Sequence, residues 1–160
     1  MIFVSVGMQM PFDRLCQTVD NWAGNQPDND IFMQIGSTSW KPRHCEYAQL
    51  IDPKEYSKYI QRASVLVMHA GIGSILAAME YGKPIIVMPR KAALKETRND
   101  HQIATARMFT NLGGIAVASD EVDLHKQLDS LDKLNKPASL SPNASNELIT
   151  AIRAFIHGEM

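Results

Sequence analysis

Residues 65–75 read Val-Leu-Val-Met-His-Ala-Gly-Ile-Gly-Ser-Ile, an apolar run followed by a turn with two glycines and a second apolar run. The run Val65 to Met68 predicts a strand buried on both faces of a sheet. The second run predicts a helix that begins near Gly73 and ends at Gly82-Lys83-Pro84, because glycine and proline together stop a helix. A strand, a turn and a helix in this order form the repeating unit of a parallel α/β sheet.

The same alternation continues on both sides of this unit. Apolar runs predict four more buried strands, at Ile2 to Val6, Asp30 to Ile35, Pro84 to Met88 and Ile115 to Ala118. Amphipathic stretches predict helices that start near Pro11, cover about Pro53 to Arg62 behind an Asp52 cap, and follow at about Asp100 to Leu112 and Asp120 to Leu134. The sequence therefore predicts an α/β fold with a parallel sheet flanked by helices.

The composition is that of an ordinary globular domain. The chain has 160 residues, of which 45% are hydrophobic and 21% charged, and its formal net charge is -1. This near-neutral charge removes the electrostatic case for nucleic acid as a partner. Cys16 and Cys45 lack the C-x-x-C spacing of a zinc or redox pair, which favours a cytoplasmic location. The uncharged run 63–79 is too short, and too interrupted by glycine, to be a membrane span.

A turn-rich stretch divides the chain unequally. Residues 135–143 are rich in Asn, Pro and Ser, and Ala144 to His157 then predicts a helix with one apolar face. We predict a main domain at residues 1–134. Residues 135–160 are predicted to be a linker and a C-terminal helix that packs on the domain or on a partner.

The turn within residues 65–75 has the composition of a phosphate-binding loop. Gly71 and Gly73 would let a phosphate approach the backbone. The first turn of the helix offers free N–H groups and the positive end of the helix dipole, and Ser74 adds a hydroxyl. The same spacing also occurs in turns that bind nothing, so both interpretations remain open.

Two better-known phosphate loops are excluded. A Walker loop requires Ser or Thr after Gly-Lys, whereas Pro84 follows Gly82-Lys83. A dinucleotide fingerprint requires a third glycine where Leu76 stands. The sequence therefore does not predict a P-loop nucleotidase or a nicotinamide or flavin enzyme.

A basic loop follows the strand at Pro84 to Met88. It carries four cations and ends in a polar cluster at the start of the next helix: Arg90, Lys91, Lys95 and Arg98, then Asn99, Asp100, His101 and Gln102. Cations at the carboxyl edge of a parallel sheet could neutralise a diphosphate leaving group. The alternative is a solvated loop in which Asn99 or Asp100 only caps the helix.

No metal site is predicted. Neither the cysteines nor any pair of histidines has metal-ligand spacing. The stretch Asp28-Asn29-Asp30 has the D-x-D form, but it stands in a turn before a strand, and we expect it to be solvated.

A series of motifs in a fixed order resembles the C-terminal domain of glycosyltransferase family 28. The motifs are Val4-Ser5-Val6-Gly7 with Pro11-Phe12-Asp13-Arg14-Leu15, Gln34-Ile35-Gly36, His69-Ala70-Gly71-Ile72-Gly73-Ser74, Glu80-Tyr81-Gly82-Lys83-Pro84 and Arg98-Asn99-Asp100-His101-Gln102. The resemblance covers about residues 1–130 and is strongest to PssE-type subunits of bacterial exopolysaccharide synthesis. It extends to the catalytic subunit of the split N-acetylglucosaminyltransferase of lipid-linked oligosaccharide synthesis.

The resemblance implies a Rossmann-like domain, the C-terminal-type half of a GT-B glycosyltransferase that binds a UDP-sugar. A separate membrane-anchored subunit would bind the acceptor and recruit this chain to the inner face of the membrane. The implied reaction moves a sugar from UDP to a lipid-linked saccharide acceptor with inversion, in exopolysaccharide or cell-surface glycan synthesis, without a metal or other cofactor. The alternative is a non-catalytic nucleotide-sugar binding or regulatory subunit.

Carried over residue by residue, the resemblance assigns substrate binding to three groups. The floor of the cleft would be lined by Gly7, Gln34 and Gly36. The diphosphate would be held by His69, Gly71, Gly73 and Ser74. The donor sugar would be contacted by Asn99, Asp100, His101 and Gln102. The amides of Gly73 and Ser74, with Arg90 or Arg98, would stabilise the leaving group. The catalytic base is assigned to no residue of this chain and is expected on the partner.

Ribose recognition departs from the family pattern. Related enzymes carry a glutamate for the ribose hydroxyls at the position of Ala77, whereas Glu80 lies three residues later in this sequence. Three residues return to nearly the same face of a helix. The resemblance therefore implies that Glu80 takes over the ribose contact.

Overall fold

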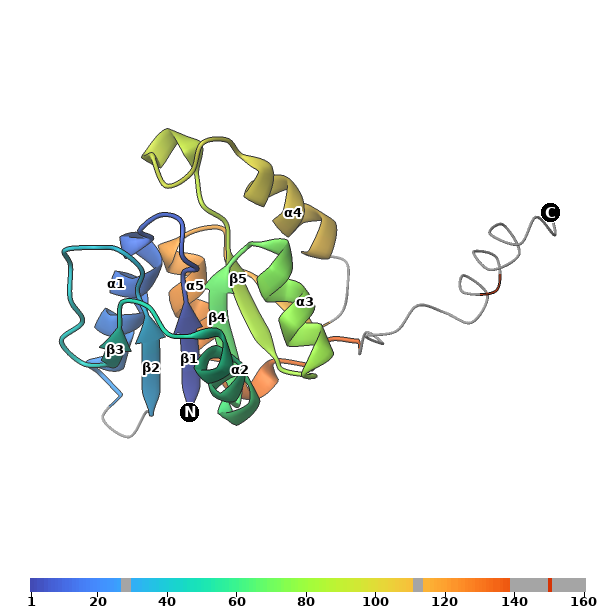
Figure 1. Cartoon of the computed structure of the whole chain (residues 1–160), viewed down its shortest axis with the longest axis horizontal. Helices are drawn as coiled ribbons and strands as arrows, with labels where there is room; N and C mark the ends of the chain where they lie inside the picture. The colour runs from blue at the N-terminus through green and yellow to red at the C-terminus, as the bar shows by residue number, and fades with distance from the viewer. Residues whose placement is uncertain (27–29, 111–113, 139–149, 151–160) are drawn as a thin grey trace.

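The computed structural model describes residues 1–26, 30–110, 114–138 and residue 150. At its centre is a six-stranded sheet in the order β3-β2-β1-β4-β5-β6, and neighbouring strands are parallel throughout (Figure 1). The strands are β1 (Ile2–Ser5), β2 (Ile31–Gln34), β3 (Glu46–Ala48), β4 (Val65–His69), β5 (Ile85–Met88) and β6 (Ile115–Val117). Because the strands run in one direction, their carboxyl ends meet at a single edge of the sheet.

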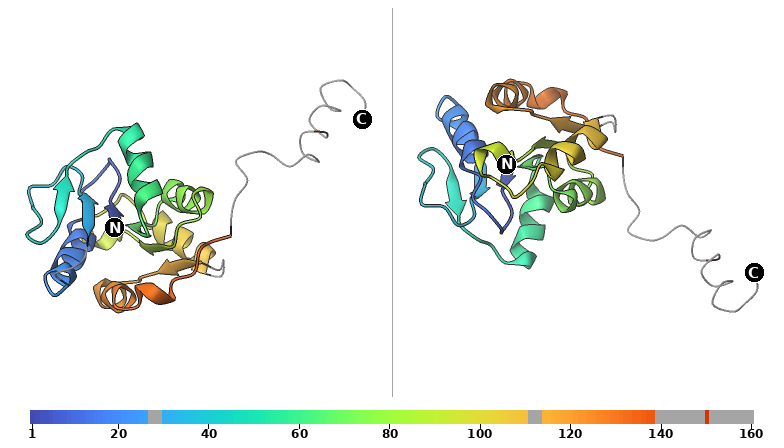
Figure 2. Two further views of the ribbon diagram at one scale, coloured as in Figure 1. Left: turned by 90° about the horizontal axis from the view of Figure 1, so that it is seen from below. Right: turned by 90° about the horizontal axis from the view of Figure 1, so that it is seen from above.

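Helices cover both faces of the sheet. They are α1 (Asp13–Ala23), α2 (Pro53–Arg62), α3 (Ile72–Glu80), α4 (His101–Thr110) and α5 (Glu121–Leu128). Helices α1 and α5 pack on one face, whereas α2, α3 and α4 pack on the other (Figure 2). Short 3-10 helices lie at Ala92–Leu94 and Leu131–Lys133. Among the described helices, none combines the length and apolar character needed to cross a bilayer.

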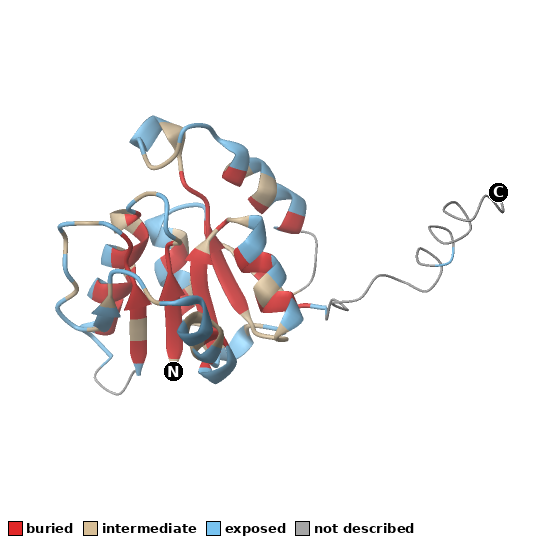
Figure 3. Ribbon diagram, in the orientation of Figure 1, coloured by how far each residue is buried: buried red, intermediate tan, exposed pale blue. Residues whose placement is uncertain are grey.

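The core follows from the alternation of side chains along the strands. In β1, Ile2 and Val4 belong to the cluster under α1 and α5, and Phe3 belongs to the cluster under α2 and α3. The Phe3 ring stacks on Tyr59 with 5.3 Å between ring centroids, and Tyr59 stacks on Phe32 at 4.1 Å. The central strands are buried along their length (Figure 3). Each fully buried apolar side chain contributes about 1.5–3 kcal/mol.

The predicted parallel α/β sheet is confirmed. All five predicted strands are present, and each begins and ends within one residue of its predicted limits. The helix predicted over Pro53 to Arg62 has those bounds, and Asp52 caps it by accepting hydrogen bonds from the N–H groups of Lys54 and Glu55 at 2.8 and 3.0 Å. The apolar runs and the capping residue in the sequence were therefore sufficient to locate the five strands and this helix.

The structure corrects two parts of the prediction, and a third part falls mostly on residues that it does not describe. Strand β3 was not predicted, because Glu46, Tyr47 and Ala48 form an outer strand without a buried apolar run. The helix predicted over residues 120–134 ends at Leu128, and a turn and a 3-10 helix follow. Apart from Thr150, the helix predicted over residues 144–157 falls outside the described residues, as does most of the predicted second segment at 135–160.

Candidate functional site

Three connections meet at the carboxyl edge of the sheet. Residues 6–12 follow β1, residues 70–71 follow β4, and residues 89–100 follow β5. These connections lie at the upper end of the sheet in Figure 1. The chain adds strands in one direction from β1 to β3 and then continues on the other side with β4. Open α/β sheets bind ligands in the crevice at such a reversal, so the candidate site lies between the ends of β1 and β4.

The turn between β4 and α3 presents two backbone N–H groups. Gly71 is the N-cap of α3 and has no side chain that could accept a hydrogen bond. The N–H groups of Ser74 and Ile75 donate to the Gly71 carbonyl at 3.1 and 3.2 Å. No acceptor in the described part of the chain receives those of Ile72 and Gly73. Free donors at this end of a helix stabilise an anion.

The two glycines of the turn have different surroundings. A Cβ atom on Gly71 would lie 2.5 Å from Nε2 of His69, so a side chain would displace the ring or the turn. A Cβ atom on Gly73 would meet nothing within 4 Å. Gly71 is therefore required by packing, whereas Gly73 borders open space. Ser74 is buried, which leaves the backbone as the main donor of the turn.

His69 ends β4 and forms part of the cleft wall. Its ring also lies against Gly7, where a Cβ atom would be 3.0 Å from Cε1 of the ring. Burial, reinforced by the positive charge of Arg90, lowers the pKa of His69 from 6.5 to about 4. The imidazole is therefore neutral at pH 7. Its Nδ1 atom is buried without a hydrogen-bond partner among the residues that the structure describes.

Gln34 positions the loop after β1. It is 2% exposed, and its Nε2 atom donates to the Gly7 carbonyl at 3.0 Å and to the Gln49 carbonyl at 3.2 Å. Its Oε1 atom accepts a 2.7 Å hydrogen bond from Ser5 Oγ. Gly7 and the adjacent Gly36 have φ angles of 75° and 71°, which glycine adopts without strain. The three residues predicted for the cleft floor thus lie together. Gln34 uses its side chain to hold the Gly7 carbonyl in place.

Arg90 departs from the predicted role. It is 4% exposed, and its guanidinium donates four hydrogen bonds to backbone carbonyls. Nη1 donates to Pro11 at 2.6 Å and to Glu96 at 3.0 Å. Nη2 donates to Val6 at 2.7 Å and to Met10 at 2.6 Å. These donors are used inside the protein, so Arg90 is not the free cation that the sequence suggested for the leaving group.

The polar cluster at the start of α4 is largely engaged in local structure. Asn99 Oδ1 accepts from the N–H of His101 at 3.2 Å and contacts its ring. Asp100 Oδ1 accepts from the N–H of Ala92 at 2.9 Å. Gln102 is 6% exposed, and its Oε1 atom accepts from the N–H of Arg90 at 3.2 Å. His101 and Gln102 still line the cleft, whereas Asn99 and Asp100 serve the loop, as the capping alternative allowed.

Two predicted residues lie apart from this arrangement. Glu80 is the exposed last residue of α3, roughly 12 Å along the helix from Ile72 at 1.5 Å per residue. The structure therefore does not bring Glu80 to the free N–H groups. Arg98 is exposed on the loop after β5, and it has no ion-pair partner within the described ranges.

Two hollows meet at Gly7 and Met8. A narrow cleft of about 90 Å³ lies between residues 6–10 and residues 96–102. A second hollow of about 290 Å³ also touches Gly7 and Met8, and it is lined further by Gln34, Ile51, Pro53 and Tyr56. Sequence reasoning assigned none of Ile51, Pro53 and Tyr56 to the site, because the stretch from Pro53 onward was interpreted only as a helix that packs on the sheet.

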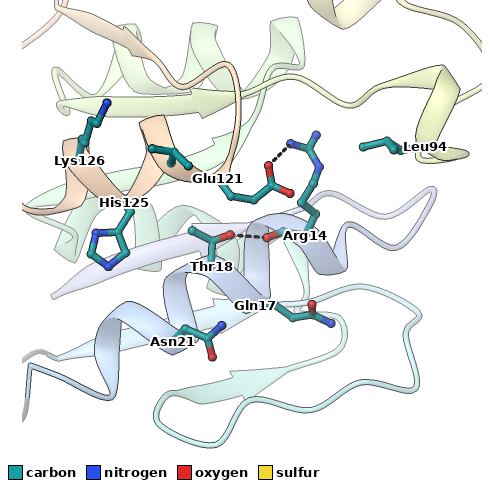
Figure 4. Close-up of a pocket in the computed structure, with 9 residues that line it drawn as sticks. Arg14, Gln17, Thr18, Asn21, Leu94, Glu121, His125 and Lys126 are labelled. Atoms are coloured by element: carbon teal, nitrogen blue, oxygen red, sulfur yellow. Dashed lines mark hydrogen bonds and ion pairs between the residues drawn. The ribbon is translucent and has the colours of Figure 1, made fainter.

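A larger groove lies elsewhere, between α1 and α5, with a volume of about 770 Å³. Arg14 of α1 pairs with Glu121 of α5 at 3.4 Å. Figure 4 shows this pair in the groove, with His125 and Lys126 further along α5. The groove contains no residue that the sequence assigned to the site. We therefore place the candidate site at the strand ends. No three His, Cys, Asp or Glu side chains of the described residues form a potential metal site.

Known proteins share both sequence and fold with this chain. UDP-N-acetylglucosamine transferase subunit ALG13 of Candida albicans is 34% identical over 56 residues, which are 35% of this chain and 18% of that protein. The solution NMR structure of ALG13 superposes with a TM-score of 0.62 over 95% of this chain and 94% of that chain, at 19% identity. The crystal structure of the glycosyltransferase of kitacinnamycin gives 0.63 over 82% of this chain and 34% of that chain, at 21% identity.

These similarities agree with the parallel α/β fold. At such identities the two structures show a shared fold, and this chain spans about a third of the kitacinnamycin enzyme. The family model described as the glycosyltransferase family 28 C-terminal domain matches residues 1–157. That match covers nearly the whole sequence and confirms the resemblance carried by the ordered motifs. The chain belongs to the glycosyltransferase family 28 C-terminal domain family.

Proposed function

We propose that this chain is the donor-binding catalytic subunit of an inverting, metal-independent glycosyltransferase that uses a UDP-sugar. The observation that carries the proposal is the pair of free N–H groups at Ile72 and Gly73, beside open space at the reversal of strand order. A diphosphate bound there would receive both hydrogen bonds and the positive end of the α3 dipole. The same donors would stabilise negative charge on UDP as it leaves.

The uridine would occupy the hollow beside Gly7. Ile51, Pro53 and Tyr56 give this hollow a largely apolar wall, which suits the face of a base. Burial raises the pKa of Tyr56, although the hydroxyls of Ser5 and Ser74 lower it in part, so the phenol stays protonated at pH 7. Glu80 is not proposed as the ribose ligand, because it lies at the other end of α3.

The sugar would lie in the narrow cleft next to His101, and the acceptor would come from a second subunit. The acceptor hydroxyl, on a lipid-linked saccharide, would attack the anomeric carbon while UDP leaves with the electrons of the broken bond. Nearby carboxylates are engaged: Arg14 binds Glu96 at 2.7 Å, and Ala92 donates to Asp100. The base that takes the hydroxyl proton would therefore belong to the partner.

The partner proposed is a membrane-anchored, acceptor-binding subunit that recruits this chain to the inner face of the membrane for exopolysaccharide or cell-surface glycan synthesis. The relative from Candida albicans is by name a subunit of UDP-N-acetylglucosamine transferase. That name supports a divided enzyme for this chain as well.

Calorimetric titration with UDP and a panel of UDP-sugars tests the proposal. We expect saturable binding that is lost in Gly73→Val, because the new side chain would occupy the open space beside the free N–H groups. Gln61→Val places the same side chain on an exposed position of α2 and should bind as the wild type does. Binding unaffected by Gly73→Val would contradict the site.

The same titration separates the catalytic subunit from a regulatory one. A donor subunit must hold the sugar, so one UDP-sugar should bind more tightly than UDP itself. Equal affinity for UDP and all UDP-sugars would favour the regulatory alternative.

A further inference from the structure

Both walls of the narrow cleft are hydrogen-bonded to one buried side chain, that of Arg90. The first wall is the loop 6–10, and Nη2 of Arg90 donates to the carbonyls of Val6 and Met10 within it. The second wall is formed by residues 96–102, and Nη1 donates to the Glu96 carbonyl. The backbone N–H of Arg90 also donates to the Gln102 side chain in this wall. The two walls are thus joined through a single residue.

Each wall is also held by a side chain other than Arg90. The effect of Arg90 on the wall positions can therefore be measured apart from the effect of these other anchors. Gln34 holds Gly7 from the side of β2. Arg14 of α1 binds the Glu96 carboxylate at 2.7 and 2.9 Å, and the N–H of Lys91 donates to the same carboxylate at 2.9 Å. Neither of these anchors crosses the cleft, whereas the Arg90 guanidinium reaches both sides.

The planar shape of the guanidinium suits this role. It offers five N–H donors in a fixed plane, of which four point to carbonyl oxygens. Its face lies over the Phe12 ring, 4.7 Å from the centroid, which supports it from the side of α1. A lysine in the same place would have three donors on one nitrogen and could not hold four carbonyls at once.

We propose that Arg90 is a positioning residue for the donor site, which sets the separation of the two cleft walls and thereby the space available to the sugar diphosphate. The inference rests on the proposed function for its ligand. Arg90 itself also lines the cleft, and the role proposed here is an indirect one, exerted through the loops that its guanidinium holds. The hydrogen bonds from Arg90 to the backbone carbonyls fix the position of Gly7 relative to His101 across the cleft.

Hydrogen exchange of the full chain, read by mass spectrometry, tests the positioning role without any ligand. In Arg90→Gln we expect faster exchange in peptides covering residues 6–12 and 90–102, and unchanged exchange in β1 and β4. Arg90→Lys should give an intermediate result. Lys83→Gln is the control, since Lys83 also donates to two carbonyls, Gln61 at 2.6 Å and Ala63 at 2.8 Å, at the opposite edge of the sheet. Exchange that rises throughout the chain, or not at all, overturns the proposal.

Titration of the same variants with UDP and UDP-sugars tests the consequence for binding. Arg90→Gln should weaken the binding of the preferred UDP-sugar about tenfold or more, as expected when several hydrogen bonds to a charged group are lost. Arg90→Lys should recover part of this affinity, and Lys83→Gln should retain all of it. Wild-type affinity in Arg90→Gln, or an equal loss in Lys83→Gln, contradicts the positioning role. A wild-type chain that binds no UDP-sugar contradicts the proposed function instead, and hydrogen exchange still decides whether Arg90 joins the walls.

Discussion

His69 lies between two glycine backbones, and this position determines its chemistry. Its ring is in contact with Gly7 on one side and Gly71 on the other, so neither position can carry a side chain without displacing the ring. Burial keeps the imidazole neutral. At the residue scale, His69 fills the space below the two connections and can exchange hydrogen bonds with a ligand, while it brings no positive charge to a phosphate.

We predict that His69 makes the fold less stable as the pH falls from 6.5 to 4. The unfolded chain would bind a proton at the ordinary pKa of 6.5, whereas the folded chain binds it only near 4. Between these values the unfolded state holds more protons, so the free energy of unfolding decreases with falling pH. The decrease should be complete near pH 4 and amount to about 3 kcal/mol.

Urea denaturation of the wild type and His69→Gln at several pH values measures this contribution. The carboxylates of the chain titrate in both proteins, so the difference between the two isolates His69. The prediction fails if both proteins lose the same free energy of unfolding between pH 6.5 and 4.

The two glycines of the turn give a second residue-scale prediction. Gly71→Ala should lower the free energy of unfolding by about 1–3 kcal/mol, because the added Cβ overlaps the His69 ring. Gly73→Ala is the matched variant, and it should leave stability unchanged or raise it by up to about 1 kcal/mol, since alanine favours a helix and meets no neighbour. Thermal unfolding followed by circular dichroism compares them. Equal effects of the two substitutions would show that the ring does not occupy the position described.

At the scale of elements, α1 anchors the long connection between β2 and β3 through Asp20. This carboxylate is buried, and it accepts from the N–H groups of Arg43 at 3.0 Å and His44 at 2.9 Å. The His44 ring also lies against Gly24 at the end of α1. A connection without helix or strand over residues 35–45 thereby gains a fixed point on the neighbouring helix.

Removing this fixed point should expose the connection to protease. In Asp20→Ala the N–H groups of Arg43 and His44 lose their acceptor, and trypsin should cleave after Arg43 about tenfold faster than in the wild type, as expected when hydrogen bonds to a charged group are lost. His44→Ala keeps the carboxylate and both backbone N–H donors, so it should be cleaved at nearly the wild-type rate. Mass spectrometry of timed digests measures both rates, and equal cleavage in Asp20→Ala and wild type would contradict the anchor.

The elements differ in how far the sequence could predict them. Strand β4 is a continuous apolar run that is buried on both faces, so its position follows from local composition. Strand β3 is an outer strand whose residues are mostly exposed, and only its pairing with β2 defines it. Long elements with a buried face were therefore predictable, and an element created by a tertiary contact was not.

The same distinction applies to the candidate site. The free N–H groups of α3 follow from a local pattern, a strand followed by glycines and a helix. The partners of Arg90 do not, because Val6 and Met10 lie 84 and 80 residues away in sequence. A cation after a buried strand suggested a ligand contact, and only the folded arrangement shows that its donors are used by the backbone.

At the scale of the whole molecule, the parallel sheet gathers three separate connections at one edge. Residues 6–12, 70–71 and 89–100 come together there because β1, β4 and β5 are neighbours that run in the same direction. Met8, in the first connection, is 76% exposed beside the cleft. In the proposed enzyme, the chain would supply one side of the crevice and the acceptor-binding subunit the other.

The central claim is that UDP binds at the N-terminus of α3, at the reversal of strand order. A titration of the ¹⁵N-labelled full chain with UDP, followed by amide chemical shifts, tests it most directly. The account predicts that the largest shift changes occur at Ile72, Gly73 and Gly7. Changes concentrated along the groove between α1 and α5, or the absence of any change at the three amides with UDP bound, would contradict it.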